Sequence, residues 1–178
     1  RVEPAAMPEL ERWVLHRLAE LDHVVRRGYA KYDFQGVFQT LFTFCTVDLS
    51  AIYFDIRKDS LYCDAPADPH RRAVRTVLDI LFHRLTTWLA PILVFTMEEV
   101  WLCRFPGPDS SVHLEDMPET PADWLDEPLA RSDGYGRGPC HTRRAPPVLG
   151  LARLFDEEGT VGSSTLAYWI AIAEVVRP

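Results

Sequence analysis

The sequence predicts an all-α fold, an antiparallel helical bundle of four to five helices with an irregular C-terminal tail. Three observations support this prediction. Apolar residues recur every three or four positions over residues 9–27, 34–62 and 71–90, the spacing of helices with buried faces. No stretch up to about Arg131 alternates apolar and polar residues convincingly, as a strand would. The connections are short, and short connections favour antiparallel neighbours.

The first predicted helix covers residues 9–27, with one apolar stripe and charged residues on the opposite side. Gly28 lies near its end, and glycine commonly follows the last turn of a helix. We therefore expect the helix to stop at Gly28.

The second predicted element begins after Asp33, a suitable N-cap residue. From Phe34 to Ile56 the chain is apolar nearly all round, which indicates a helix or helix pair buried on most faces. Core packing is the simplest role for its many aromatic side chains. Cys45 lies between aromatic residues and should behave as a small buried hydrophobic residue. Asp68 and Pro69 then lead into the next helix.

The central helix covers residues 71–90 and should kink or stop at Pro91, which cannot donate a backbone hydrogen bond. Thr96 and Glu99 have the spacing of a capping box, so we expect them to begin a short helix through Trp101. Residues 111–114 are interpreted as a short extended piece. Trp124 and Leu125 are expected to pack a terminal turn back on the bundle.

The chain divides into two predicted parts, a helical bundle over residues 1–131 and an irregular extension over residues 132–178. Gly, Pro and Arg dominate the start of the extension, a composition that buries little apolar surface. A reading-frame change in a GC-rich gene would produce such a mixture. Residues 165–176 are apolar enough for one short terminal helix.

Composition and motifs exclude several functions. The net charge of −7 argues against a generally basic nucleic-acid binder but not against a local basic patch. We find no apolar run approaching the roughly 18–20 residues that span a bilayer, and no signal peptide. Four widely separated cysteines indicate neither a zinc site nor a disulfide framework and fit a reducing cytoplasmic location. No catalytic residue or metal ligand is predicted, and His83, at the edge of a helix stripe, is interpreted as structural.

The candidate binding residues are five cations: Arg57, Lys58, Arg71, Arg72 and Arg75. If a short loop joins the second and third helices, both groups lie at the same end of the bundle. Arginine and lysine at that density could contact phosphates, which provide affinity rather than sequence reading. The alternative is a solvated helix surface whose cations pair with Asp55, Asp59, Asp64 and Asp68.

Three segments resemble the anticodon-binding helical domain of bacterial class I isoleucyl-tRNA synthetases: MPELERWVLHRL, FCTVDLSAIYFDIRKDSLY and LAPILVFTMEEVW. The resemblance covers residues 7–129. It implies that this chain binds the anticodon arm of isoleucine tRNA and packs on the catalytic domain of a parent synthetase. The parent would use ATP and magnesium, and no cofactor is implied for this chain. The family's recognition residues cannot be assigned to single positions here.

Two other functions remain open. The chain could be a stand-alone helical protein-interaction module derived from such a domain, which the net charge of −7 favours. It could also be an enzyme in its own right, but this would need a clustered polar site that the sequence does not provide.

Overall fold

A computed structural model describes residues 1–130. Its long helices are α1 (Glu9–Ala30), α2 (Phe34–Thr43), α3 (Asp55–Cys63), α4 (Pro69–Leu89) and α5 (Val94–Arg104), and a π-helix, η2 (Phe44–Phe54), joins α2 to α3. Short 3-10 helices η1 (Pro4–Ala6), η3 (Val112–Leu114) and η4 (Ala122–Trp124) and the one-turn α6 (Glu127–Ala130) complete the described part. No strand occurs within residues 1–130, which confirms the all-α prediction.

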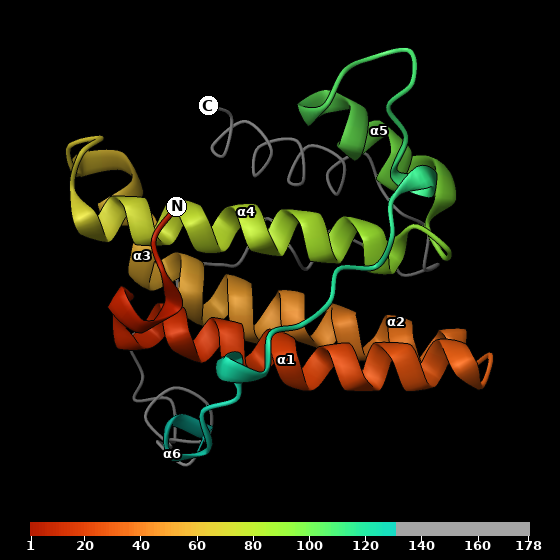
Figure 1. Cartoon of the computed structure of the whole chain (residues 1–178), viewed down its shortest axis with the longest axis horizontal. Helices are drawn as coiled ribbons and strands as arrows, with labels where there is room; N and C mark the ends of the chain where they lie inside the picture. Colours follow the sequence, from red (N-terminus) through yellow and green to blue (C-terminus); the bar gives the residue numbers. More distant parts are fainter. Residues whose placement is uncertain (131–178) are drawn as a thin grey trace.

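The core lies between α1, α4 and the α2–η2–α3 rod, which run side by side (Figure 1). Apolar residues of α1 and α4 at helical spacing are almost completely buried, including Val14, Leu18, Val25, Val77, Phe82, Leu85 and Trp88. The Tyr29 hydroxyl donates a 2.5 Å hydrogen bond to the Trp88 carbonyl, joining the end of α1 to the end of α4. The apolar stripes seen in the sequence thus form the core, as predicted.

Helix α1 continues past Gly28 to Ala30, so the prediction that it stops at this glycine is wrong. A Cβ atom at position 28 would lie 2.3 Å from a methyl carbon of Val37. Glycine is therefore needed because α2 approaches the helix closely. The turn itself is made by Tyr32, which has a left-handed φ of 58°, and Asp33 caps α2 by accepting a hydrogen bond from the Gly36 amide, as predicted.

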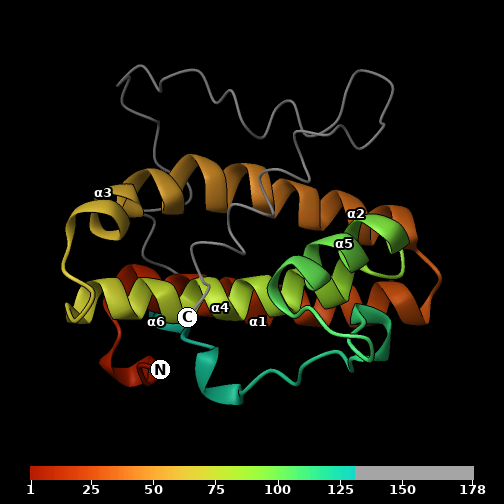
Figure 2. The ribbon, with the colours of Figure 1, turned by 90° about the horizontal axis from the view of Figure 1, so that it is seen from above.

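Within residues 1–130, the α2–η2–α3 rod is covered on one face only, whereas the sequence predicted that most of its faces would be buried. Among its members only Val37, Leu41, Phe44, Leu49 and Tyr53 are buried by the described residues. Figure 2 shows α1 and α4 on one side of the rod. The sequence pattern overestimated how much of the rod is buried, because an apolar sequence does not show how many other helices pack against it.

By length and composition, the stretch Phe34–Cys63 could cross a membrane, so the expectation that no such run exists was too strict. One helix of this kind is weak evidence for a membrane segment, because core helices of soluble proteins pass the same test. Here one face of the stretch contributes residues to the bundle core.

Helix α4 ends just before Pro91, as predicted, but the capping box does not form. Helix α5 begins at Val94, and its N-cap residue Leu93 makes no side-chain cap. Thr96 therefore already lies inside the first turn, and Glu99 is exposed. The expected extended piece at residues 111–114 is a 3-10 turn instead, since Glu98 accepts hydrogen bonds from Ser111 Oγ at 3.0 Å and from the Val112 amide at 2.9 Å.

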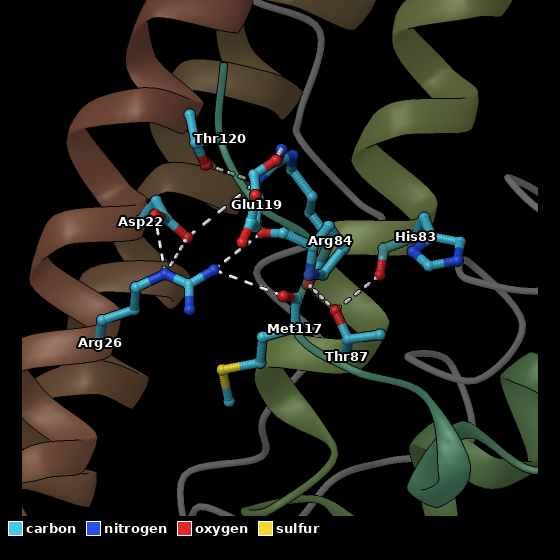
Figure 3. Close-up of polar contacts among 9 residues, drawn as sticks. Asp22, Arg26, His83, Arg84, Thr87, Met117, Glu119 and Thr120 are labelled. Carbon is cyan, nitrogen blue, oxygen red and sulfur yellow. Dashed lines mark hydrogen bonds and ion pairs between the residues drawn. The ribbon is translucent and has the colours of Figure 1, made fainter. Parts of the chain in front are cut away.

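Residues 115–126 form a strap that crosses α1 and α4 and is fixed by Arg84 (Figure 3). The Arg84 side chain is 4% exposed and donates hydrogen bonds of 2.7 Å to both the Glu119 carbonyl and Thr120 Oγ1. Its guanidinium carbon lies 4.7 Å from the ring centre of Trp124, which is buried as predicted. Leu125, expected to pack beside it, is exposed instead. The predicted helix at residues 165–176 and the extension from residue 132 lie outside the described residues.

Candidate nucleic-acid interface

The five predicted cations belong to α3 and α4, and the corner between these two helices lies at one end of the bundle (Figure 1). Asp68 creates this corner: its carboxylate caps α4 by accepting hydrogen bonds from the amides of His70, at 2.8 Å, and Arg71, at 3.3 Å. Pro69 occupies the first helical turn, where its missing amide hydrogen costs nothing. The local sequence therefore fixes where α4 starts and which cations its first turn presents.

Arg57, a predicted phosphate ligand, is paired with an acidic residue of α1, which argues against that role. Its guanidinium donates hydrogen bonds of 2.6 and 2.8 Å to the two carboxylate oxygens of Glu11 on α1. The Glu11 side chain is 0% exposed and that of Arg57 is 14% exposed. Such a bidentate pair satisfies a buried carboxylate that would otherwise be strongly destabilising. Arg57 thus connects α3 to α1, and its positive charge is neutralised by Glu11.

Lys58 points to solvent and has one acidic neighbour. Its Nζ lies 2.7 Å from an Asp55 carboxylate oxygen, one turn earlier on α3. This hydrogen bond, followed by the charge of Asp55, raises the pKa of Lys58. Exposed pairs of this type contribute little to stability, so a phosphate could replace Asp55 at small cost. The pair agrees with the alternative that some of these cations meet nearby acids.

The three arginines of α4 have different environments. Arg71 is half-buried and donates a 2.6 Å hydrogen bond to the Asp64 carbonyl, which closes the α3–α4 loop. Arg72 is exposed and forms no ion pair within residues 1–130. Arg75 is half-buried further along α4. At the corner, Lys58 and Arg72 are therefore exposed to a ligand in solution, and Arg71 is partly exposed.

Tyr62 is a feature of this corner that the sequence reasoning missed. Its side chain is 80% exposed at the end of α3. It follows Lys58 by four residues, so the two share one face of the helix. The signal was present in the sequence, because Lys58, Asp59 and Ser60 mark this turn as a surface. An exposed aromatic ring beside cations is typical of proteins that stack unpaired nucleic-acid bases.

The other titratable groups do not assemble into a second site at this corner. No group of three or more His, Cys, Asp or Glu residues within residues 1–130 could hold a metal ion. Burial lowers the pKa of His83, which packs edge-on against Trp101 and supports the structural role predicted for it. Burial also raises the pKa of the Cys45 thiol to about 12, as expected for an inert thiol. A cavity of about 340 Å³ lies beside Arg84 and the strap, away from the corner.

The sequence matches the anticodon-binding domain of tRNA ligases over residues 11–137. The chain belongs to this family. It is 73% identical over 122 residues to the isoleucine–tRNA ligase of Ruegeria pomeroyi, a match that covers 68% of this chain and 12% of that protein. The ligases of Mesorhizobium japonicum and Gluconobacter oxydans are 58% and 49% identical over 159 and 163 residues, 89% and 92% of this chain. The chain spans 12–16% of the length of these relatives.

These matches confirm the resemblance seen in the sequence. They concern the whole bundle and do not single out particular side chains. The corner residues remain candidates, and their role is tested below.

Proposed function

We propose that the α3–α4 corner binds the anticodon arm of isoleucine tRNA, with Tyr62 stacking on an unpaired base and Lys58, Arg71 and Arg72 contacting phosphates. The exposed Tyr62 ring carries this proposal, because an 80% exposed tyrosine has no packing role within the described bundle. Stacking on an aromatic ring is the usual way in which proteins hold single-stranded RNA bases. Arg57 and Arg75 are left out, the first because it is paired with Glu11 and the second because it lies one turn further along α4 from the corner.

The chain would act as one domain of a longer cytoplasmic ligase. In that enzyme a separate catalytic domain would use ATP and magnesium to attach isoleucine, and this bundle would position the tRNA. The proposal rests on the family match and on the observation that this chain matches only a small part of the length of its relatives. A stand-alone protein-interaction module would retain the same fold without affinity for tRNA, so RNA binding separates the two functions.

The test measures binding of the 178-residue chain to the anticodon stem-loop of isoleucine tRNA by fluorescence anisotropy at several salt concentrations. Tyr62→Ala should weaken binding about tenfold with an unchanged salt slope, because base stacking contributes about 1–3 kcal/mol. Arg72→Ala should weaken binding and reduce the salt slope by about 0.7–0.9, the value for one lost phosphate contact.

Matched controls lie away from the corner. Phe95→Ala removes an aromatic ring that is 85% exposed on α5, and Arg27→Ala removes an exposed arginine near the end of α1. Both variants should bind as the unmodified chain does. Absence of binding at low salt, or equal losses in the control variants, would exclude the α3–α4 corner as the RNA site.

A further inference from the structure

A buried histidine of α1, His16, contacts the backbone of the chain that follows the strap. Residues 122–130, here called the docked segment, contain η4 and α6, which lie against α1 (Figure 1). The His16 side chain is 5% exposed, and its Nδ1 atom lies 3.1 Å from the backbone nitrogen of Asp126. The contact joins two residues that are 110 positions apart in the sequence. His16 therefore helps to hold the docked segment on the bundle.

This hydrogen bond determines where the His16 ring carries its proton. A backbone amide can only donate, so Nδ1 is the acceptor, and the ring is neutral with its proton on Nε2. Nε2 has no hydrogen-bond partner within residues 1–130, and an oxygen of Glu20 lies 3.6 Å from it. A second proton would bind to Nδ1 and would place two donors face to face. Protonation of His16 and the hydrogen bond from Asp126 therefore exclude each other.

Charged groups of α1 and η2 act on the His16 ring whether or not the segment is docked. Glu20, one turn later on α1, favours a protonated ring, and Arg12, one turn earlier, opposes it. Glu20 also pairs with Arg17, which in turn bonds Asp48 of η2 at 3.0 Å. Because none of these four groups belongs to the docked segment, their effects largely cancel when the docked and released states are compared.

Two carboxylates whose side chains the structure describes belong to the docked segment, Asp123 and Asp126. Asp126 Oδ1 accepts a hydrogen bond from the Leu129 amide at 3.2 Å, and Oδ2 lies 3.7 Å from Nη1 of Arg12. Asp123 is exposed. Water and these partners weaken the attraction of both carboxylates for a protonated ring. The loss of the hydrogen bond inside a buried contact is not screened in this way, so protonation favours release of the segment.

We propose that His16 is a proton-sensitive switch: its neutral ring holds the docked segment on α1, and protonation of Nδ1 releases the segment. Histidine changes its charge between about pH 8 and pH 5. Because release is accompanied by uptake of one proton, docking weakens as the pH falls, by at most about tenfold per pH unit. Release exposes Leu129, which is 7% exposed while docked. It ends at the strap, because Arg84 holds Glu119 and Thr120 independently of His16.

The first test is hydrogen exchange of the unmutated 178-residue chain, measured by mass spectrometry and corrected for the intrinsic pH dependence of exchange. Between pH 7.5 and 5.5, protection of a peptide over residues 122–130 should fall about tenfold. Peptides from α4 should lose less protection, which separates local release from general unfolding. Equal protection of residues 122–130 at both pH values would overturn the proposal. An equal loss in the α4 peptides would also overturn it, because the whole bundle would then be opening.

Two further measurements assign the response to His16. Long-range ¹H–¹⁵N NMR at pH 7.5 should find the ring proton on Nε2, and a proton on Nδ1 would overturn the proposal. His16→Asn keeps an acceptor near the position of Nδ1 but cannot gain a proton, so residues 122–130 should be equally protected at both pH values.

The matched control is His23→Asn, which changes an exposed histidine two turns later on α1. His83→Gln is a second control, because His83 lines the cavity beside the strap. Residues 122–130 of both control variants should respond to pH as they do in the unmodified chain. A response that persists in His16→Asn, or one that disappears in either control, would assign the pH dependence to another group and overturn the proposal.

Discussion

The substitution Arg57→Ala tests whether Arg57 stabilises the bundle or binds RNA. The change leaves the Glu11 carboxylate, which is 0% exposed, without the two hydrogen bonds that now satisfy it. Removing one partner of a buried pair typically costs about 3–5 kcal/mol. Arg57 itself is 14% exposed, so water can reach the vacated space in part, and we expect a loss near the lower limit, about 3 kcal/mol.

The assay is urea unfolding followed by circular dichroism, with Lys58→Ala as the neighbouring control. Lys58→Ala should change the midpoint little, because its pair with Asp55 is exposed. The double variant Glu11→Leu, Arg57→Met should recover most of the lost stability, since apolar side chains can replace a buried pair at little cost. At equal folded fractions, Arg57→Ala should bind the anticodon stem-loop as the unmodified chain does. Unchanged stability combined with weakened binding would refute the reasoning.

Two further predictions concern the strap and its surroundings. Arg84→Ala should destabilise the bundle by about 3 kcal/mol or more, because it leaves the acceptors at Glu119 and Thr120 unpaired. Arg84→Lys should not restore the lost stability, since an ammonium group cannot donate in the geometry of the planar guanidinium. Differential scanning calorimetry measures the stability of both variants. The lowered pKa of His83 means that the unfolded chain binds this proton more readily than the folded one. Stability should therefore be retained above about pH 6.5, the ordinary histidine pKa, and be lost as the pH falls below it. Urea midpoints between pH 7.5 and 5.5 should shift less for His83→Gln, and an equal shift would contradict this assignment.

The sequence was sufficient for features that depend on local chemistry. The apolar stripes predicted the positions of α1, α4 and the α2–η2–α3 rod, and Pro91 predicted the end of α4. Asp33 and Asp68 have side chains suited to capping, and both act as N-caps. Each feature depends on residues within about one helical turn. The capping box failed even though it too is local, because the first turn of α5 begins two residues before Thr96. A sequence pattern does not fix the register of a helix start.

The errors concern contacts between distant parts of the chain. Gly28 matched a helix terminator, but its function depends on Val37 across the helix interface. Arg57 matched a surface cation, yet Glu11 is 46 positions away and is reached only once α1 and α3 pack together. The α2–η2–α3 rod matched a helix buried on most faces, because composition does not reveal how many neighbours a helix has. Tyr62 was not among the candidate residues, because the search for binding residues considered charged side chains, and the structure leaves its ring exposed.

The charge pattern also limits how RNA binding can work. With a net charge of −7, the chain repels a polyanion at long range. Among the described residues, we assign Lys58, Arg71 and Arg72 at the corner to oppose this repulsion. Two to three phosphate contacts predict a slope of log affinity against log salt of about −1.4 to −2.7 for the stem-loop. Affinity should therefore be modest for the isolated chain and higher within a ligase, where tethering to other RNA contacts raises the effective concentration. A slope steeper than about −5 would require more cations than this corner holds and would move the site to another face.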